Sequence, residues 1–264
     1  MLFLLLACTD PVDTLEMPDT DGTDAPSWDT SFDVGDPWIG VVGGLFEMGS
    51  PEGDDIPANQ NPMHTVNVPS FALMRHEVRV VDYEDCVADG GCTPRPENCY
   101  GTDRPNRPVN CVTWSQATDF CAWYGGRLPT ESEWEFAATN RGAGATYPWG
   151  EEEPDCTRVN VGNGQGTPDC GAGMWDVCTH PLGDSPLGFC ELAGNAFEWT
   201  QDWFWPTYDG HPTDGSARDE MADDFKVMRG GGIGSGVEPT TRERTFHPVE
   251  FYYGGMGVRC AMDP

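Results

Sequence analysis

Apolar and polar positions follow two different patterns along this chain. Three segments carry the spacing and the boundary signals of helices: residues 81–91, 113–126 and 128–138. Two others alternate residue by residue, as short half-buried strands do: residues 64–73 and 256–262. Glycine (33 residues) and proline (23 residues) interrupt both patterns throughout. We therefore predict an α+β fold with few, short regular elements and long loops.

The starts of two predicted helices are marked by side chains that satisfy free backbone groups. Thr113 and Gln116 have the spacing of a capping box, and so do Thr130 and Glu133. Three acidic residues cluster at the start of the last helix: Glu131, Glu133 and Glu135. The helix dipole favours acidic side chains there, so we interpret this cluster as structural rather than catalytic.

Composition divides the chain into three parts. Residues 1–8 (MLFLLLAC) resemble a lipoprotein signal in which Cys8 is lipidated, and a plain apolar tail is the alternative. Residues 9–36 are rich in Asp, Thr and Pro and poor in large apolar groups, which predicts an acidic disordered linker. Residues 37–264 show no further linker or repeat, so we predict one folded domain there.

The net charge of -30 limits the partners of this protein. Lys226 is the single lysine, and no lysine or arginine precedes Arg75. Nucleic acids and anionic membrane surfaces need clustered positive charge, so we exclude nucleic acid and expect membrane contact only through a lipid anchor. A divalent cation is a more plausible partner, and we expect a monomer.

Eleven cysteines favour export to an oxidising compartment, such as the bacterial cell envelope. Without a lipidated Cys8, ten cysteines remain, which is an even number. The sequence contains no CxxC motif, so it does not indicate a zinc ribbon or a thioredoxin-type site. Disulfides are the better interpretation.

Common catalytic signatures are absent from the sequence. The GGGIGSG run near Gly232 lacks the spacing of a nucleophile elbow, a P-loop or a dinucleotide-binding loop. The five histidines are scattered, which gives a His-ligated metal site little support. One aromatic run fits either a ligand platform or, with more weight, the core: Trp199, Trp203, Phe204, Trp205 and Tyr208.

The stretch ELAGNAFEW is different, because two carboxylates bracket a run of small residues. Glu191 and Glu198 could form an acid/base pair, a metal cage or two solvated charges around a turn. Calcium binds six to eight oxygens, which carboxylates and backbone carbonyls supply together. Nothing local desolvates one carboxylate as a catalytic pair requires. We therefore favour a calcium cage.

Several phrases, in this order, resemble the formylglycine-generating enzyme (sulfatase-modifying factor) family. They cover roughly residues 38–262: GLFEMGS, HTVNVPSFALMRHEVRVVDYEDC, RPVNCVTWSQATDFCAWYGGRLPTESEWEFAAT, YPWG, LAGNAFEWTQDWF, RGGG and GGMGVRCA. The resemblance implies a C-type-lectin-like single domain, rich in loops and disulfides, with bound structural calcium.

The resemblance also implies particular calcium ligands. One calcium site would use the stretch just described, through Glu191, Gly194, Ala196 and Glu198. A second calcium site would use Asn160 and Val161.

The resemblance also implies one disulfide, between Cys121 and Cys260, which are far apart in the sequence. The connectivity of the other eight cysteines stays open, and pairing between sequence neighbours is the arrangement we favour: Cys86 with Cys92, Cys99 with Cys111, Cys156 with Cys170, and Cys178 with Cys190.

This chain departs from the family pattern at the copper site. Family members that oxidise a substrate cysteine to formylglycine hold copper through two cysteines, and those positions fall at about Ser235 and Thr240 here. No cysteine occurs between Cys190 and Cys260. Copper(I) needs soft thiolates, so we expect no copper and no formylglycine formation.

Two functions remain open for an exported domain of this kind. The first is a calcium-stabilised binding module that presents residues 203–225 and 232–250 to a protein, peptide or small-molecule ligand. The second is an oxidoreductase or maturation enzyme that uses a site without cysteine. Its weak catalytic candidates are Arg242, Arg244 and His247, which could instead pair with surface acids.

Overall fold

Three helices form where the apolar spacing predicts them. They are α1 (Val80–Ala88), α2 (Trp114–Trp123) and α3 (Glu131–Ala138). Both predicted capping boxes are present: the hydroxyl of Thr113 accepts from the N–H of Gln116 at 3.2 Å, and that of Thr130 accepts from Glu133 at 3.1 Å. These caps explain why α2 and α3 begin where they do, because each satisfies a backbone N–H that the helix itself leaves free.

The computed structural model describes residues 37–51, 53, 56–96, 99, 104–162, 170–171, 173–234 and 238–264. The predicted signal (1–8), the predicted linker (9–36) and Ser235 lie outside these residues, and every described element lies in the unit Phe32–Pro264. Two 3-10 turns occur, η1 (Ala58–Gln60) and η2 (Pro181–Gly183). Among the described residues, no helix has both the length and the apolar character needed to cross a membrane.

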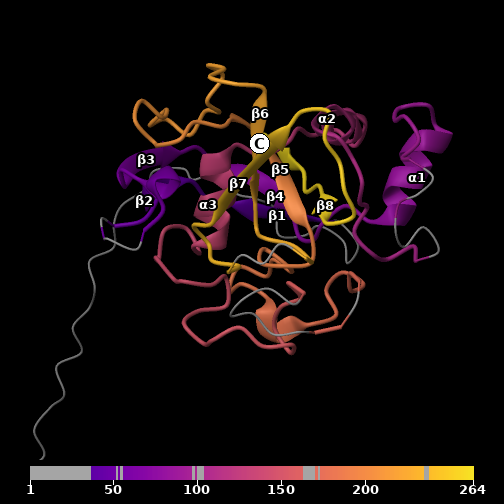
Figure 1. Cartoon of the computed structure of the whole chain (residues 1–264), viewed down its shortest axis with the longest axis horizontal. Helices are drawn as coiled ribbons and strands as arrows, with labels where there is room; N and C mark the ends of the chain where they lie inside the picture. Colours follow the sequence, from indigo (N-terminus) through magenta and orange to yellow (C-terminus); the bar gives the residue numbers. More distant parts are fainter. Residues whose placement is uncertain are drawn as a thin grey trace, which may run out of the picture. The chain divides into compact units, whose positions relative to one another are not determined.

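The strands form three small sheets (Figure 1). The first has the order β1-β4-β9, from Trp38–Val41, Phe71–Met74 and Ala261–Met262. The second pairs β2 (Gly44–Met48) with β3 (His64–Val68). The third has the order β7-β6-β5-β8, from Arg244–Pro248, Phe225–Arg229, Phe197–Trp203 and Met256–Gly257. Only β5 and β8 are parallel among these pairs. The predicted α+β class, with few regular elements, is confirmed.

Helix α3 contacts β2, β3, β5 and β6, and so lies between the β2–β3 pair and the four-stranded sheet (Figure 1). Its Trp134 is fully buried, and Trp199 of β5 is fully buried in a neighbouring apolar cluster. The disulfide between Cys121 and Cys260 ties α2 to the end of the chain. This packing brings β5, β6 and α3 together around the buried charges described next.

Candidate functional site

Glu198 of β5 is fully buried against a guanidinium. Arg259 Nη2 and Nε lie 2.8 and 2.9 Å from its Oε1, and the indole N–H of Trp134 donates to its Oε2 at 2.7 Å. Arg259 also donates to the carbonyl oxygens of Met74 and Cys190 at 2.9 and 2.8 Å. The cation beside Glu198 in this structure is therefore a guanidinium.

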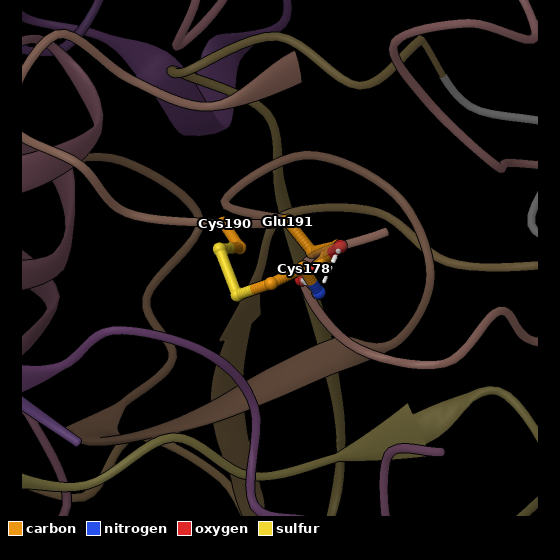
Figure 2. A group of neighbouring side chains, drawn as sticks. All are labelled: Cys178, Cys190 and Glu191. Carbon is orange, nitrogen blue, oxygen red and sulfur yellow. Dashed lines mark hydrogen bonds between the residues drawn. A yellow bond between two sulfur atoms is a disulfide. The ribbon is translucent and has the colours of Figure 1, made fainter. Parts of the chain in front are cut away.

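Glu191, the other end of the stretch, faces the backbone of Cys178 (Figure 2). The Cys178 N–H donates to both carboxylate oxygens, at 2.8 and 3.1 Å. Burial raises the pKa of Glu191 to about 7. Cys190 lies next to this carboxylate but is bonded to Cys178, so neither sulfur is a thiolate that could bind metal (Figure 2).

Asn195, in the middle of the stretch, ties it to three other segments. Its N–H donates to the Asn160 carbonyl at 2.6 Å, and its own carbonyl accepts from Ile233 at 3.2 Å. Its side-chain oxygen accepts from the N–H of Trp175 at 2.9 Å. The residue has φ 61°, a left-handed conformation that asparagine tolerates better than most side chains. The loop is thus held in one conformation from several sides.

Glu77 lies next to the same loop, although no local pattern in the sequence identifies it. It is fully buried, and its two oxygens accept from the Ala196 N–H at 3.0 Å and from the Asn195 side chain at 3.1 Å. Burial, and then the nearby Glu191 and Glu198, raise the pKa of Glu77 well above its usual value.

Three carboxylates therefore share one guanidinium, that of Arg259: Glu77 and Glu198, which are fully buried, and Glu191, which is half-buried. We name this group the acid-rich cluster. Two negative charges would remain if all three carboxylates were ionised, so the cluster can either hold protons or bind a cation. The carbonyl oxygens of Leu192 and Ala196 lie near Gly230, 3.6 and 3.8 Å from the position that an added Cβ would take, and a ring carbon of Trp134 lies nearer still, at 3.3 Å. Gly194 contributes an N–H bond to the Gly230 carbonyl at 2.7 Å.

Asn160 offers a second place for a cation. Its side chain donates to the Gly173 carbonyl at 2.9 Å, while its Oδ1 is buried and has no hydrogen-bond partner within the described part of the chain. The Val161 carbonyl accepts from the Gly234 N–H at 3.1 Å. A buried amide oxygen left without a partner costs free energy, and calcium is a cation that such an oxygen can bind.

The expected copper-ligand positions hold no sulfur. Position 240 is a half-buried threonine, and its N–H donates to the Glu238 carbonyl at 2.9 Å. Position 235 is a serine that lies outside the described residues.

All ten cysteines from Cys86 to Cys260 form disulfides. The long-range pair joins Cys121 to Cys260. The four short-range pairs are Cys86 with Cys92, Cys99 with Cys111, Cys156 with Cys170, and Cys178 with Cys190. The pair Cys121–Cys260 is the one that the family resemblance implies, and the other four are the neighbour pairings that we favoured. None of the ten sulfurs is therefore a free thiolate in this structure.

The proposed polar cluster at residues 242–247 needs a correction, because its side chains do not gather at the surface. Arg244 is 2% exposed and holds both oxygens of Glu131, at 2.5 and 2.8 Å. Arg242 donates to the Gly49 carbonyl at 2.9 Å, and His247 stacks on Phe251. Arg244 stands at the start of β7, where its side chain is buried, so it pairs with a buried acid rather than a ligand or a surface acid.

Helix α3 places its three acids inside the protein, and two of them contact Arg229. The Arg229 guanidinium lies 3.0 Å from Glu131 and 2.6 Å from Glu135, and all three side chains are fully buried. Burial alone would raise the pKa of Glu131, but Arg244 and Arg229 outweigh it and lower the pKa to about 2. From the sequence alone, the helix dipole is the only reason we found for acidic residues at these positions. We name Glu131, Glu135, Arg229 and Arg244 the matched cluster.

The aromatic run divides between core and cation contacts. Three of its members are buried, as the core interpretation expects: Trp199, Phe204 and Tyr208. Trp203 instead lies under Lys226, whose Nζ is 3.7 Å from the ring centre, and Trp205 stacks on Arg218 at 4.1 Å. These half-buried rings bind the protein's own cations.

A pocket of about 500 Å³ opens beside the start of α2. Its lining combines polar and charged side chains with two prolines and one aromatic ring: Thr93, Pro94, Arg95, Pro96, Thr113, Ser115, Gln116, Asp119, Glu250 and Tyr252. Arg95 is half-buried there, and its one hydrogen bond within the described residues goes to the Asn110 carbonyl at 3.3 Å. Glu250 comes from the segment expected to present a ligand-binding surface.

Comparison with known proteins finds relatives along most of the chain. The formylglycine-generating enzyme of Streptomyces coelicolor is 30% identical, over 85% of this chain and 88% of that protein. The hercynine oxygenase of Mycobacterium tuberculosis is also 30% identical, but the match covers 78% of this chain and only 55% of that longer protein.

Solved structures show the same fold. PvdO from Pseudomonas aeruginosa matches with a TM-score of 0.72 at 23% identity, over 86% of this chain and 94% of that chain. Treponema denticola variable protein 1 matches with a TM-score of 0.68 at 19% identity, over 86% and 95%. The model of the sulfatase-modifying factor enzyme 1-like domain matches residues 31–264. The chain belongs to the sulfatase-modifying factor (formylglycine-generating enzyme) family.

Proposed function

We propose that this protein is a calcium-stabilised binding module of its family and does not form formylglycine. One observation carries the proposal: every cysteine from Cys86 to Cys260 is held in a disulfide. Copper(I) chemistry of the family's kind needs a pair of thiolates, and the corresponding positions are Ser235 and Thr240. A serine or threonine hydroxyl is a hard, weak ligand for copper(I).

Calcium is the metal that the remaining side chains favour. The acid-rich cluster has more carboxylates than cations, and Asn160 keeps a buried oxygen without a partner among the described residues. Oxygen ligands of this kind suit calcium. Asn160 Oδ1 and the Val161 carbonyl would hold one ion. At the other site Glu198 already holds Arg259, so Glu191 and the carbonyls near Gly230 are the available ligands.

The pocket beside α2 supplies a place for a ligand on this scaffold. The disulfides Cys86–Cys92 and Cys99–Cys111 hold the chain on both sides of residues 93–96, so this part of the lining is preformed. Within the described residues Arg95 keeps N–H groups available for a carboxylate, while Asp119 and Glu250 suit an ammonium or amide. A peptide or small zwitterion matches this pattern of charges.

Export agrees with the disulfides, which persist in oxidising compartments. Attachment through a lipidated Cys8 belongs to the same proposal, as do a monomeric state and the absence of nucleic-acid partners.

The test of the binding function compares two arginines. Purified protein is titrated with a library of amino acids and short peptides while NMR chemical shifts are recorded. We expect binders whose shifts map to Gln116 and Tyr252, lost in Arg95→Met and retained in Arg104→Met, a variant of an exposed arginine. No binder for the wild-type protein would refute the proposal, and so would equal binding in both variants.

A second function, catalysis at a site without cysteine, is favoured by Glu77. This buried carboxyl has a raised pKa and contacts Asn195, whose carbonyl accepts from Ile233, two residues before Ser235. Perturbed acids next to a family's reaction site are typical catalytic candidates. Incubating the protein with cysteine-containing peptides and copper, followed by mass spectrometry, decides between the two functions, because the binding module leaves the peptide cysteine unchanged.

A further inference from the structure

Two histidines form a short chain that ends on buried carboxylates. His64 Nδ1 lies 3.0 Å from the Pro62 carbonyl oxygen, and His211 Nδ1 lies 2.9 Å from the Pro212 carbonyl oxygen. A carbonyl only accepts, so the hydrogen-bond network assigns the ring proton to Nδ1 in both cases. The Nε2 of His64 then accepts from His211 Nδ1 at 3.4 Å. Burial lowers the pKa of His64, which keeps that ring neutral near pH 7.

This arrangement leaves the Nε2 lone pair of His211 unused. The side chain is 1% exposed, and Nε2 has no hydrogen-bond partner in the part of the chain that the structure describes. It lies 3.6 Å from Asp202 Oδ1, which is too long for a hydrogen bond. Two ligands about 2.1 Å from a tetrahedral metal ion lie about 3.4 Å apart. The separation therefore suits two atoms that share a metal ion.

Glu131 supplies a third ligand. One ligand atom each from His211, Asp202 and Glu131 lie within 4.8 Å of one another, and all three residues are buried. Glu131 Oε2 accepts one hydrogen bond, from Arg244 at 2.8 Å, and keeps a lone pair free. Asp202 Oδ1 likewise accepts one hydrogen bond, from the Arg218 N–H at 2.8 Å.

The surroundings supply both carboxylates and cations. Glu131 and Glu135 pair with Arg229 and Arg244, and Lys226 and Arg218 lie close enough to Asp202 to interact with its charge. The His211 ring is oriented by its Nδ1–H bond to the Pro212 carbonyl, which is the usual support for a metal-binding imidazole.

We propose that His211 Nε2, Asp202 Oδ1 and Glu131 Oε2 bind one divalent transition-metal ion, for which zinc is the probe. One imidazole and two carboxylates suit zinc or cobalt better than calcium, which prefers oxygen alone. The ion joins α3 and β5 to the loop that carries His211. This site is separate from the acid-rich cluster and from the pocket beside α2.

The test uses the full chain, stripped of metals and then kept in excess calcium. Zinc is titrated by calorimetry, and cobalt(II) is added separately so that its absorption and its paramagnetic broadening of histidine NMR signals can be followed. We expect about one zinc per chain in the wild-type protein and in His180→Gln, a histidine stacked on Trp175 at 3.5 Å. In His211→Gln we expect binding at least about tenfold weaker.

Cobalt also tests the wild-type protein alone, should the His211 variant fail to fold. The proposal predicts that the ring signals of His211 broaden before those of His180 and His247, without the thiolate bands of a cysteine site. The proposal is overturned if zinc binds His211→Gln as tightly as wild type. It is also overturned if the wild-type protein binds no zinc and the His211 ring simply takes up a proton.

Discussion

Two buried charge clusters contact Trp134, and the pKa values of their glutamates are shifted in opposite directions. The Trp134 ring lies 5.1 Å from the Arg229 guanidinium of the matched cluster, and its indole N–H donates to Glu198 of the acid-rich cluster. In the matched cluster, two carboxylates meet two guanidinium groups, and the pKa of Glu131 falls to about 2 despite complete burial.

The acid-rich cluster has three carboxylates and one guanidinium. Burial raises the pKa of Glu191 to about 7 and that of Glu77 well above its usual value, although Arg259 lies nearby. The number of cationic partners, rather than burial, therefore decides which acids are ionised. The acids of the matched cluster are paired with guanidinium groups, whereas the acid-rich cluster has the charge to take up calcium.

The largest expected effect comes from breaking the matched cluster. Glu131→Gln leaves Arg244 without its bidentate partner in the interior, so we expect the free energy of unfolding to fall by about 3–5 kcal/mol. Urea denaturation measures this loss. Glu153→Gln, at an exposed position, is the control and should change stability by less than about 0.5 kcal/mol. A loss below about 1 kcal/mol for Glu131→Gln would show that the cluster does not depend on its ion pairs.

Calcium should stabilise the protein through its unmatched acids and the unpartnered oxygen of Asn160. At a calcium concentration of about 100 Kd we expect the free energy of unfolding to rise by about 2.7 kcal/mol. Asn160→Ala and Glu191→Gln should each reduce this gain, while Glu153→Gln should leave it unchanged. Denaturation curves recorded with calcium and with a chelator measure this gain in stability. Identical curves under the two conditions would refute the calcium proposal.

The pH dependence of the acid-rich cluster provides a third test, in calcium-free buffer. The pKa of Glu191 rises from 4.5 to about 7 on folding, so the folded protein binds more protons than the unfolded chain between these values. Stability should therefore fall as pH rises through this window, and Glu191→Gln should remove the part of that fall that Glu191 contributes. Relative to wild type, the variant should gain about 2 kcal/mol between the two ends of the window. A parallel pH profile for the two proteins would contradict the raised pKa.

The smallest effect is expected at a surface ion pair. Arg158 lies 2.6 Å from Asp155, whose side chain is 50% exposed, so solvent screens the pair. Arg158→Met should change the free energy of unfolding by less than about 1 kcal/mol. A loss as large as that of Glu131→Gln would mean that burial is not what distinguishes the matched cluster.

The sequence predicts much of the fold because its signals there are local. The capping residues Thr113 and Thr130 set the helix starts through bonds to residues three positions away. The family resemblance supplies long-range information, such as the pairing of Cys121 with Cys260.

The buried charges are harder to predict, because their partners are far apart in the chain. Arg244 reaches Glu131 across 113 positions, and Glu77 reaches Asn195 across 118. No periodicity in the sequence reveals such pairs. The sequence therefore suggests a surface role for Arg244 and does not identify Glu77 as part of the site. His211 is likewise one of five scattered histidines until the fold places it beside Asp202.

The most direct test of the central claim is elemental analysis of the oxidised, purified protein. The protein is dialysed against trace calcium and copper and then analysed for both elements, with a thiol titration alongside. We predict about one or two calcium ions per chain, no free thiol between Cys86 and Cys260 and no copper above background. Stoichiometric copper, or titratable thiols in that range, would contradict the claim that this chain has lost the copper chemistry of its family.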